Sequence, residues 1–197
     1  MSPVPARQRE SAGSVEAEYR ATLAGLVSGG AIGRLKARDP GLWSADEATA
    51  AAIQRRLGWL DAPRWLREQI PELRAFAADV RAAGFTRVLL LGMGGSSLAP
   101  EVFQRVGVAG PGAPTLEVLD STDPAAIQSA EAAARLDHTF FLVASKSGAT
   151  IETLSQYRYF RSRVEGLGLP RPGDRFAAVT DAGSALDRLA TGGAELG

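Results

Sequence analysis

From residue 87 onward, short apolar segments alternate with segments of helical periodicity, and this alternation limits the possible folds more than any other feature of the chain. The apolar segments cover 88–91, 116–119, 139–144 and 176–179, and the helical segments after them cover 98–106, 124–135, 150–164 and 184–190. Apolar strands that alternate with helices form a parallel sheet covered on both faces. Right-handed crossovers place the loops that follow the strands at one edge of that sheet. We therefore predict a three-layer α/β domain.

The sequence divides into three regions of different character. Residues 1–15 are rich in Pro, Ser and Ala, and we expect a disordered segment or a linker there. Residues 16–84 carry helical patterns only, whereas residues 85–197 carry the α/β alternation. Because four strands leave an exposed sheet edge, we expect the domain to be incomplete at its C-terminus.

The helical region gives several local predictions. Helices are expected over about 16–27 and about 63–83. Ser44 is expected to cap the helix between these two, because Glu47 follows at the spacing of a capping box. Pro71 predicts a kink or a break in the last helix. The three tryptophans of the region are expected to pack inside it; they are Trp43, Trp59 and Trp65.

Composition excludes several classes of site and partner. The formal net charge is +0, which gives no field to attract nucleic acid or an anionic membrane. The absence of Cys removes disulfides and thiolate chemistry, and a single His makes a histidine metal centre improbable. We expect no metal, no cofactor and no membrane span, and since no apolar signal core is found at the N-terminus, we expect a cytoplasmic protein.

The segment Ser145-Lys146-Ser147-Gly148-Ala149-Thr150-Ile151-Glu152-Thr153 directly follows the apolar segment 139–144. A helix start offers unpaired backbone N–H groups and the positive end of the helix dipole to an anion. Hydroxyl groups of Ser145, Ser147 and Thr150 can add donors, Lys146 can add a charge, and Gly148 lets the backbone approach closely. We predict a phosphate loop here; the alternative is a plain strand-to-helix turn capped by Ser147.

A second polar turn, Gly92-Met93-Gly94-Gly95-Ser96-Ser97, follows the apolar segment 88–91. It matches neither the dinucleotide fingerprint nor the P-loop, so it is less specific. Either a small ligand approaches the glycines and receives a bond from Ser96 or Ser97, or tight packing requires glycine. Thr122 or Asp123 is expected to cap the helix that follows, with Pro124 as its first residue. His138 lies at the opposite sheet edge, where a structural role is expected.

These turns resemble the phosphoglucose isomerase family, whose sugar-isomerase (SIS) domains have a flavodoxin-like fold and bind hexose phosphates. The turn at 92–100 is similar to the family's GIGGSxLGP, with Met93 in place of Ile. The loop at 145–153 is similar to SKTxTTxET, with Ser147 in place of Thr and without a hydroxyl at 149. Residues 36–44 and 56–60 are similar to the isomerase half of bifunctional transaldolase/phosphoglucose isomerases.

The resemblance implies a function and a set of site residues. Family members interconvert glucose 6-phosphate and fructose 6-phosphate through an enediol, in glycolysis and gluconeogenesis. The resemblance places Gly95 and Ser96 on the sugar and Glu152 in the active-site network. It places four residues of the loop at the phosphate: Ser145, Lys146, Ser147 and Thr150. Lys146 is also a candidate for the active-site network.

The family's glutamate base, arginine and ring-opening histidine all lie downstream of the phosphate loop. The resemblance therefore implies an N-terminal part of a glucose-6-phosphate isomerase that is homodimeric when full-length. We expect the isolated chain to bind hexose 6-phosphate weakly and to be catalytically inert. Two alternatives remain, namely a sugar-phosphate-sensing SIS module without turnover and another SIS enzyme such as an amino-sugar isomerase.

Overall fold

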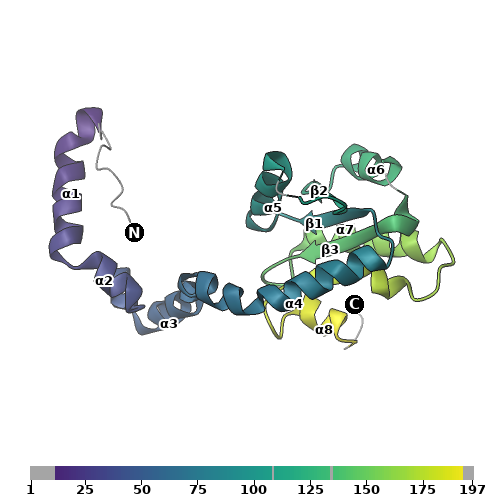
Figure 1. The fold of residues 1–197 in the computed structure, drawn as a ribbon. Coiled ribbons are helices and arrows are strands. Elements are labelled where there is room, and N and C mark those ends of the chain that lie inside the picture. The colour runs from purple at the N-terminus through teal and green to yellow at the C-terminus, as the bar shows by residue number, and fades with distance from the viewer. Residues whose placement is uncertain (1–11, 108, 134, 193–197) are drawn as a thin grey trace. The chain divides into compact units, whose positions relative to one another are not determined.

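The computed structural model describes residues 12–107, 109–133 and 135–192 (Figure 1). The chain divides into two units, Met1–Pro71 and Glu72–Gly197, and each unit is described by itself below. Most of the segment predicted to be disordered or a linker lies outside the described residues, and the short 3-10 helix Gly13–Val15 lies inside them. The extension of the helical region to residue 84 stays a prediction.

The first unit is helical in its described part. Its α-helices are α1 (Glu16–Ser28), α2 (Ala31–Lys36), α3 (Glu47–Arg56) and the first half of α4 (Ala62–Ala82). Two 3-10 helices, η2 (Pro40–Leu42) and η3 (Leu57–Leu60), connect them. The three tryptophans are more than half exposed, so the prediction that they pack inside this region is wrong.

The cap of α3 differs from the prediction. Asp46 is the N-cap, and its Oδ2 accepts a hydrogen bond of 2.8 Å from the backbone N of Thr49. Ser44 instead accepts a bond of 3.1 Å from the backbone N of Asp46 and so forms the turn before the helix. A carboxylate at the helix start also interacts with the dipole, which favours Asp46 over Ser44 as the cap.

Pro71 does not break α4, which runs continuously from Ala62 to Ala82. Proline in a helix interior removes one backbone hydrogen bond. Packing of the second half of the helix offsets this loss, because Val80 is buried and Phe76 meets Phe140 edge to face with ring centroids 5.7 Å apart.

The second unit contains a four-stranded sheet, and all its strand pairs are parallel. The strands are β1 (Arg87–Gly92), β2 (Thr115–Leu119), β3 (Thr139–Ala144) and β4 (Phe176–Val179), in the order β2-β1-β3-β4. The helices between and after them are α5 (Gly95–Val106), α6 (Pro124–Ala132), α7 (Ile151–Glu165) and α8 (Ala185–Ala190). Two 3-10 helices, η4 (Leu136–His138) and η5 (Pro172–Arg175), precede β3 and β4.

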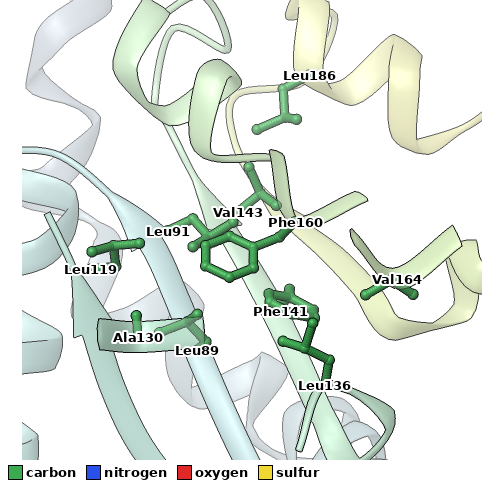
Figure 2. Close-up of a cluster of buried hydrophobic side chains, with 10 residues drawn as sticks. All are labelled: Leu89, Leu91, Leu119, Ala130, Leu136, Phe141, Val143, Phe160, Val164 and Leu186. Atoms are coloured by element: carbon green, nitrogen blue, oxygen red, sulfur yellow. The ribbon is translucent and has the colours of Figure 1, made fainter. Parts of the chain in front are cut away.

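The main core lies between one sheet face and the helices α6, α7 and α8 (Figure 2). Alternate strand residues enter it, which are Leu89, Leu91, Phe141 and Val143. The intervening residues Leu90 and Phe140 are also buried, on the other face, where Phe140 meets Phe76 of α4. Both faces are therefore covered, and the predicted three-layer parallel α/β fold is confirmed.

Most of the apolar side of α7 meets the core, because Phe160 and Val164 are fully buried and Leu154 and Tyr157 pack against the buried cluster. Hydrophobic spacing puts Ile151, Leu154, Tyr157, Phe160 and Val164 on one side, yet Ile151 is 72% exposed. The fully buried residues of the helix are Thr153, Gln156, Phe160 and Val164. Ile151 is the first residue of α7, directly after the loop, and it is the exception on this side of the helix.

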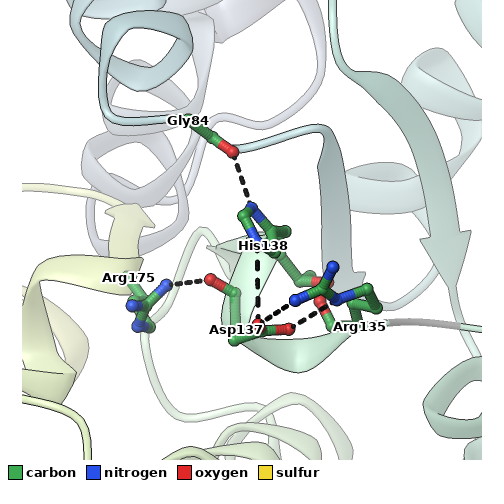
Figure 3. A network of polar contacts seen from close by, with 6 residues as sticks. Gly84, Arg135, Asp137, His138 and Arg175 are labelled. Carbon is green, nitrogen blue, oxygen red and sulfur yellow. Dashed lines mark hydrogen bonds and ion pairs between the residues drawn. The ribbon is translucent and has the colours of Figure 1, made fainter.

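A polar network lies at the amino ends of the strands (Figure 3). The Nδ1 atom of His138 is 3.0 Å from the carbonyl oxygen of Gly84, and Arg175 donates a 2.7 Å bond to the carbonyl oxygen of Asp137. The hydrogen bond from Arg135 holds the pKa of the Asp137 carboxyl below its usual value. His138 thus joins the segments before β1 and β3, and its predicted place at the edge opposite the polar turns is confirmed.

Candidate functional site

The two polar turns begin side by side. Gly92, the last residue of β1, pairs in register with Ala144, the last residue of β3. From β1 the chain moves to β2 on one side and returns to β3 on the other, so the strand order reverses between these two ends. In open parallel sheets, ligands bind in the crevice at such a reversal, outside the carboxyl ends of the strands.

Ser145 and Thr150 are joined within the predicted phosphate loop. Their hydroxyl oxygens are 2.9 Å apart, and Ser145 is only 2% exposed. Thr150 is the N-cap residue of α7, but its side chain makes no capping hydrogen bond. The backbone N–H groups of the first turn of α7 therefore receive no cap from this side chain, and such groups bind anions.

Ser147 does not cap α7 as the simpler interpretation of this turn expects. Its hydroxyl accepts a 3.2 Å bond from the backbone N of Ala149, and the residue is exposed. Glu152 lies in the first turn of α7 and is half-buried. Because Ser147 is exposed and its hydroxyl can rotate, that hydroxyl can still donate to a ligand at the loop.

Gly148 is required by packing within the protein. Its φ angle is +66°, and a Cβ atom there would lie 2.6 Å from the Ser184 hydroxyl oxygen and 2.8 Å from the backbone N of Leu186. Ser184 in turn caps α8, since its hydroxyl accepts a 3.0 Å bond from the backbone N of Asp187. The bend of the phosphate loop at Gly148 therefore depends on the start of α8.

Lys146 is held by the loop between β4 and α8. Its Nζ lies 2.8 Å from Oδ2 of Asp181, and its carbonyl oxygen accepts a 3.1 Å bond from the backbone N of Asp181. The backbone N of Ser145 donates to the carbonyl oxygen of Val179 at 3.0 Å. Thus the loop predicted to bind phosphate is fixed by residues about 35 positions later in the chain.

The two serines of the glycine turn after β1 have different roles. Gly94, at φ +55°, is the N-cap of α5. Ser97 is buried and its hydroxyl donates a 2.9 Å bond to the carbonyl oxygen of Gly94, so it is occupied internally. Ser96 is half-buried, and a Cβ atom at Gly95 would meet nothing within 4 Å. Of the two serines considered in the sequence, Ser96 is the one left to face a ligand.

The other strand-end residues have structural partners. Of the two predicted caps of α6, Asp123 is the N-cap, since its Oδ1 accepts bonds from the backbone N atoms of Ala125 and Ala126 at 2.9 and 3.1 Å. The Thr180 and Ser184 hydroxyl oxygens are 2.8 Å apart. Among the residues that the structure describes, no group of three or more His, Asp or Glu side chains could hold a metal ion.

Gln156 is a residue near the site that the sequence did not reveal. It is fully buried on α7, and its Nε2 donates to the carbonyl oxygens of Leu119 and Ser121 at 3.2 and 3.0 Å. Its Oε1 and the Oγ1 of Thr153 are buried without a hydrogen-bond partner in the described part of the chain. The sequence does carry a signal for this residue. Thr153 and Gln156 recur at helical spacing with Phe160, so these two polar residues share the buried side of α7.

Comparison with known proteins identifies related sequences, although no protein-family model matches the chain. A glucose-6-phosphate isomerase of Acaryochloris marina is 39% identical over 132 residues, which is 61% of this chain and 25% of that protein. The enzyme of the same name from Geobacter sulfurreducens is 35% identical over 176 residues, covering 82% of this chain and 30% of that protein. The chain thus spans about a quarter to a third of the length of these relatives.

Solved structures agree with these relatives. A crystal structure of a glucose-6-phosphate isomerase from Chlamydia trachomatis matches 78% of this chain and 28% of its own, with a TM-score of 0.56 and 27% identity. A hypothetical protein from Thermus thermophilus shares the fold, with a TM-score of 0.58 over 89% of this chain at 22% identity. The predicted resemblance to phosphoglucose isomerase is confirmed, and this chain is related in sequence and fold to part of the glucose-6-phosphate isomerases.

Proposed function

We propose that this chain supplies the phosphate- and sugar-binding part of a glucose-6-phosphate isomerase. The observation that carries the proposal is the loop Ser145–Thr150, which starts α7 at the carboxyl end of β3, directly beside the end of β1. A hexose 6-phosphate carries a dianion at one end and hydroxyl groups along its length. The turn after β3 is rich in hydrogen-bond donors and matches the dianion. The turn after β1 is rich in glycine and matches the hydroxyl-bearing carbon chain.

The phosphate would be bound by backbone and side-chain donors acting together. The backbone N–H groups of the first turn of α7 donate hydrogen bonds to the phosphate and present the positive end of the helix dipole to it. The hydroxyl groups of Ser145, Ser147 and Thr150 leave two hydrogens for the phosphate, since one of the bonded pair Ser145 and Thr150 donates to the other. The ammonium group of Lys146 adds a positive charge. Burying a dianion without such partners is very costly, so several donors must act at once.

The sugar would lie towards the turn after β1. Gly95 leaves open space for a hydroxyl-bearing carbon chain, and Ser96 can donate to it or accept from it. Glu152 lies in the first turn of α7 and would belong to the network that orients the sugar. Isomerisation transfers a proton from C2 to C1 through an enediol, which is redox-neutral and needs a base near C2.

We assign no such base to the described residues of this chain, and we propose that the chain by itself binds its ligand without turnover. The family resemblance places the base, the arginine and the ring-opening histidine downstream of the phosphate loop. By the same resemblance we propose a homodimer for the full-length protein, a cytoplasmic location, and residues 85–197 as the sugar-phosphate domain. In the described residues, no helix has the length and apolar character that crossing a membrane requires.

The proposal predicts weak binding without catalysis. Titration calorimetry of the 197-residue chain with 6-phosphogluconate, which resembles the open-chain substrate, should show one site with a Kd of about 0.1–10 mM. Gluconate should show no heat of binding, because it lacks the dianion. A coupled assay with fructose 6-phosphate should show no turnover above the background. Equal affinity for gluconate and 6-phosphogluconate would contradict the phosphate site, and turnover would contradict the assignment of binding alone.

A further inference from the structure

The loop between β4 and α8, residues 180–184, contacts the only cation of the phosphate loop 145–153. Lys146 is the only Lys or Arg in the segment 145–153. Its Nζ is 2.8 Å from Oδ2 of Asp181, and that carboxylate is the only one in the loop 180–184. The single cation that the loop offers to a phosphate is thus paired with a carboxylate of the protein.

The geometry of this pair is set by the backbone. The backbone N of Asp181 donates to the carbonyl oxygen of Lys146 at 3.1 Å, which keeps the two side chains together. The Thr180 hydroxyl is 3.4 Å from the same carbonyl oxygen. Asp181 is therefore placed beside Lys146 independently of the ion pair, and an asparagine in its place would keep the same position.

The pair is also exposed, with side-chain exposures of 75% for Lys146 and 60% for Asp181. Exposed ion pairs are weak because water screens them, so Lys146 can exchange one anion for another at little cost. A dianionic phosphate ester attracts the ammonium group more strongly than a carboxylate does, and it also receives the amide and hydroxyl donors.

We propose that Asp181 competes with the ligand for Lys146 and thereby limits the affinity of the loop for a phosphate ester. The proposal rests on the proposed function of the phosphate loop. Asp181 lowers the affinity for all anions by withholding Lys146 and by its own negative charge. A phosphate ester overcomes this cost because it also receives the amide and hydroxyl donors of the loop.

The test is a calorimetric comparison of the 197-residue chain with its D181N variant, using 6-phosphogluconate as the probe. At about 20 mM salt, D181N should bind about three- to tenfold more tightly, and the gain should shrink at about 300 mM salt as screening increases. D174N is the matched control: Asp174 also forms an exposed ion pair, with Arg171, and precedes β4 at the other end of that strand. It should change the affinity by less than about twofold.

Lys146 provides the second arm of the test. In a K146M background, D181N should increase the affinity less than it does in the unsubstituted chain. Only the direct repulsion between Asp181 and the ligand is then removed, because no ammonium group remains to be released. Unchanged or weaker binding by both D181N and D181A overturns the proposal, while binding by the unsubstituted chain still supports the phosphate site. If the unsubstituted chain binds no 6-phosphogluconate, the proposed function itself fails, and this inference fails with it.

Discussion

A triple variant that replaces Ser145 and Ser147 with Ala and Thr150 with Val should lose measurable binding of 6-phosphogluconate. Hydrogen bonds to a charged group contribute roughly 1.5–3 kcal/mol each, and about 1.4 kcal/mol corresponds to a tenfold change in affinity. One hydroxyl of the Ser145–Thr150 pair donates to the other, so the triple variant loses two bonds to the phosphate, and binding should weaken at least about 100-fold. Because Ser145 and Thr150 bond to each other, both must be replaced to avoid leaving one polar group unpaired. Titration calorimetry measures the result.

The matched control removes three hydroxyl groups elsewhere on the same unit. Ser129, Ser155 and Ser162 are exposed residues of α6 and α7, and their replacement with Ala should leave the affinity unchanged within about twofold. Thermal unfolding of both triple variants checks that they fold. Undiminished affinity in the Ser145, Ser147 and Thr150 variant would remove the phosphate assignment from this loop.

Replacement of Gly148 with Ala should both destabilise the second unit and abolish ligand binding. The left-handed backbone at φ +66° costs a side-chain-bearing residue about 1–2 kcal/mol. The added Cβ would also lie 2.8 Å from the backbone N of Leu186, which cannot move without displacing α8. Overpacking of this kind costs about 1–3 kcal/mol more. We expect a loss of about 2–5 kcal/mol in the free energy of unfolding, measured by chemical denaturation.

Gly168 provides the control for this substitution. Its φ angle is +67°, and a Cβ atom there would meet nothing within 4 Å. Its replacement with Ala should cost only the backbone contribution, about 1–2 kcal/mol, and should leave 6-phosphogluconate binding intact. Equal stability of the two alanine variants, with binding retained in both, would show that the contact between Gly148 and α8 is unimportant.

Much of the fold could be predicted because the strands are apolar, short and bounded by polar turns. The predicted segments 139–144 and 176–179 coincide with β3 and β4. The capping of α3 was predicted less well, because two acceptors, Ser44 and Asp46, stand two residues apart and only geometry decides between them. Pro71 shows that tertiary packing can retain a helix that local rules would interrupt.

The sequence predicts which residues of one turn act together in the site, but it does not predict contacts between different turns. Neighbouring residues such as Ser145 and Thr150 belong to one local pattern, and sequence spacing suggests that they cooperate. Contacts between distant segments leave no such pattern. The pairing of Lys146 with Asp181 and the approach of α8 to Gly148 depend on how β3 and β4 align, so they became visible only in the structure.

The central claim is that the loop after β3 captures a dianionic ester through its amides and hydroxyl groups. The most direct measurement is a ¹H–¹⁵N NMR titration of the chain with 6-phosphogluconate, repeated with gluconate. Our account predicts that 6-phosphogluconate shifts the amide signals of Ser147 to Thr153, with smaller shifts at Gly95 and Ser96, whereas gluconate shifts none of them. Amide signals in this loop that do not move, while signals elsewhere respond to 6-phosphogluconate, would contradict it.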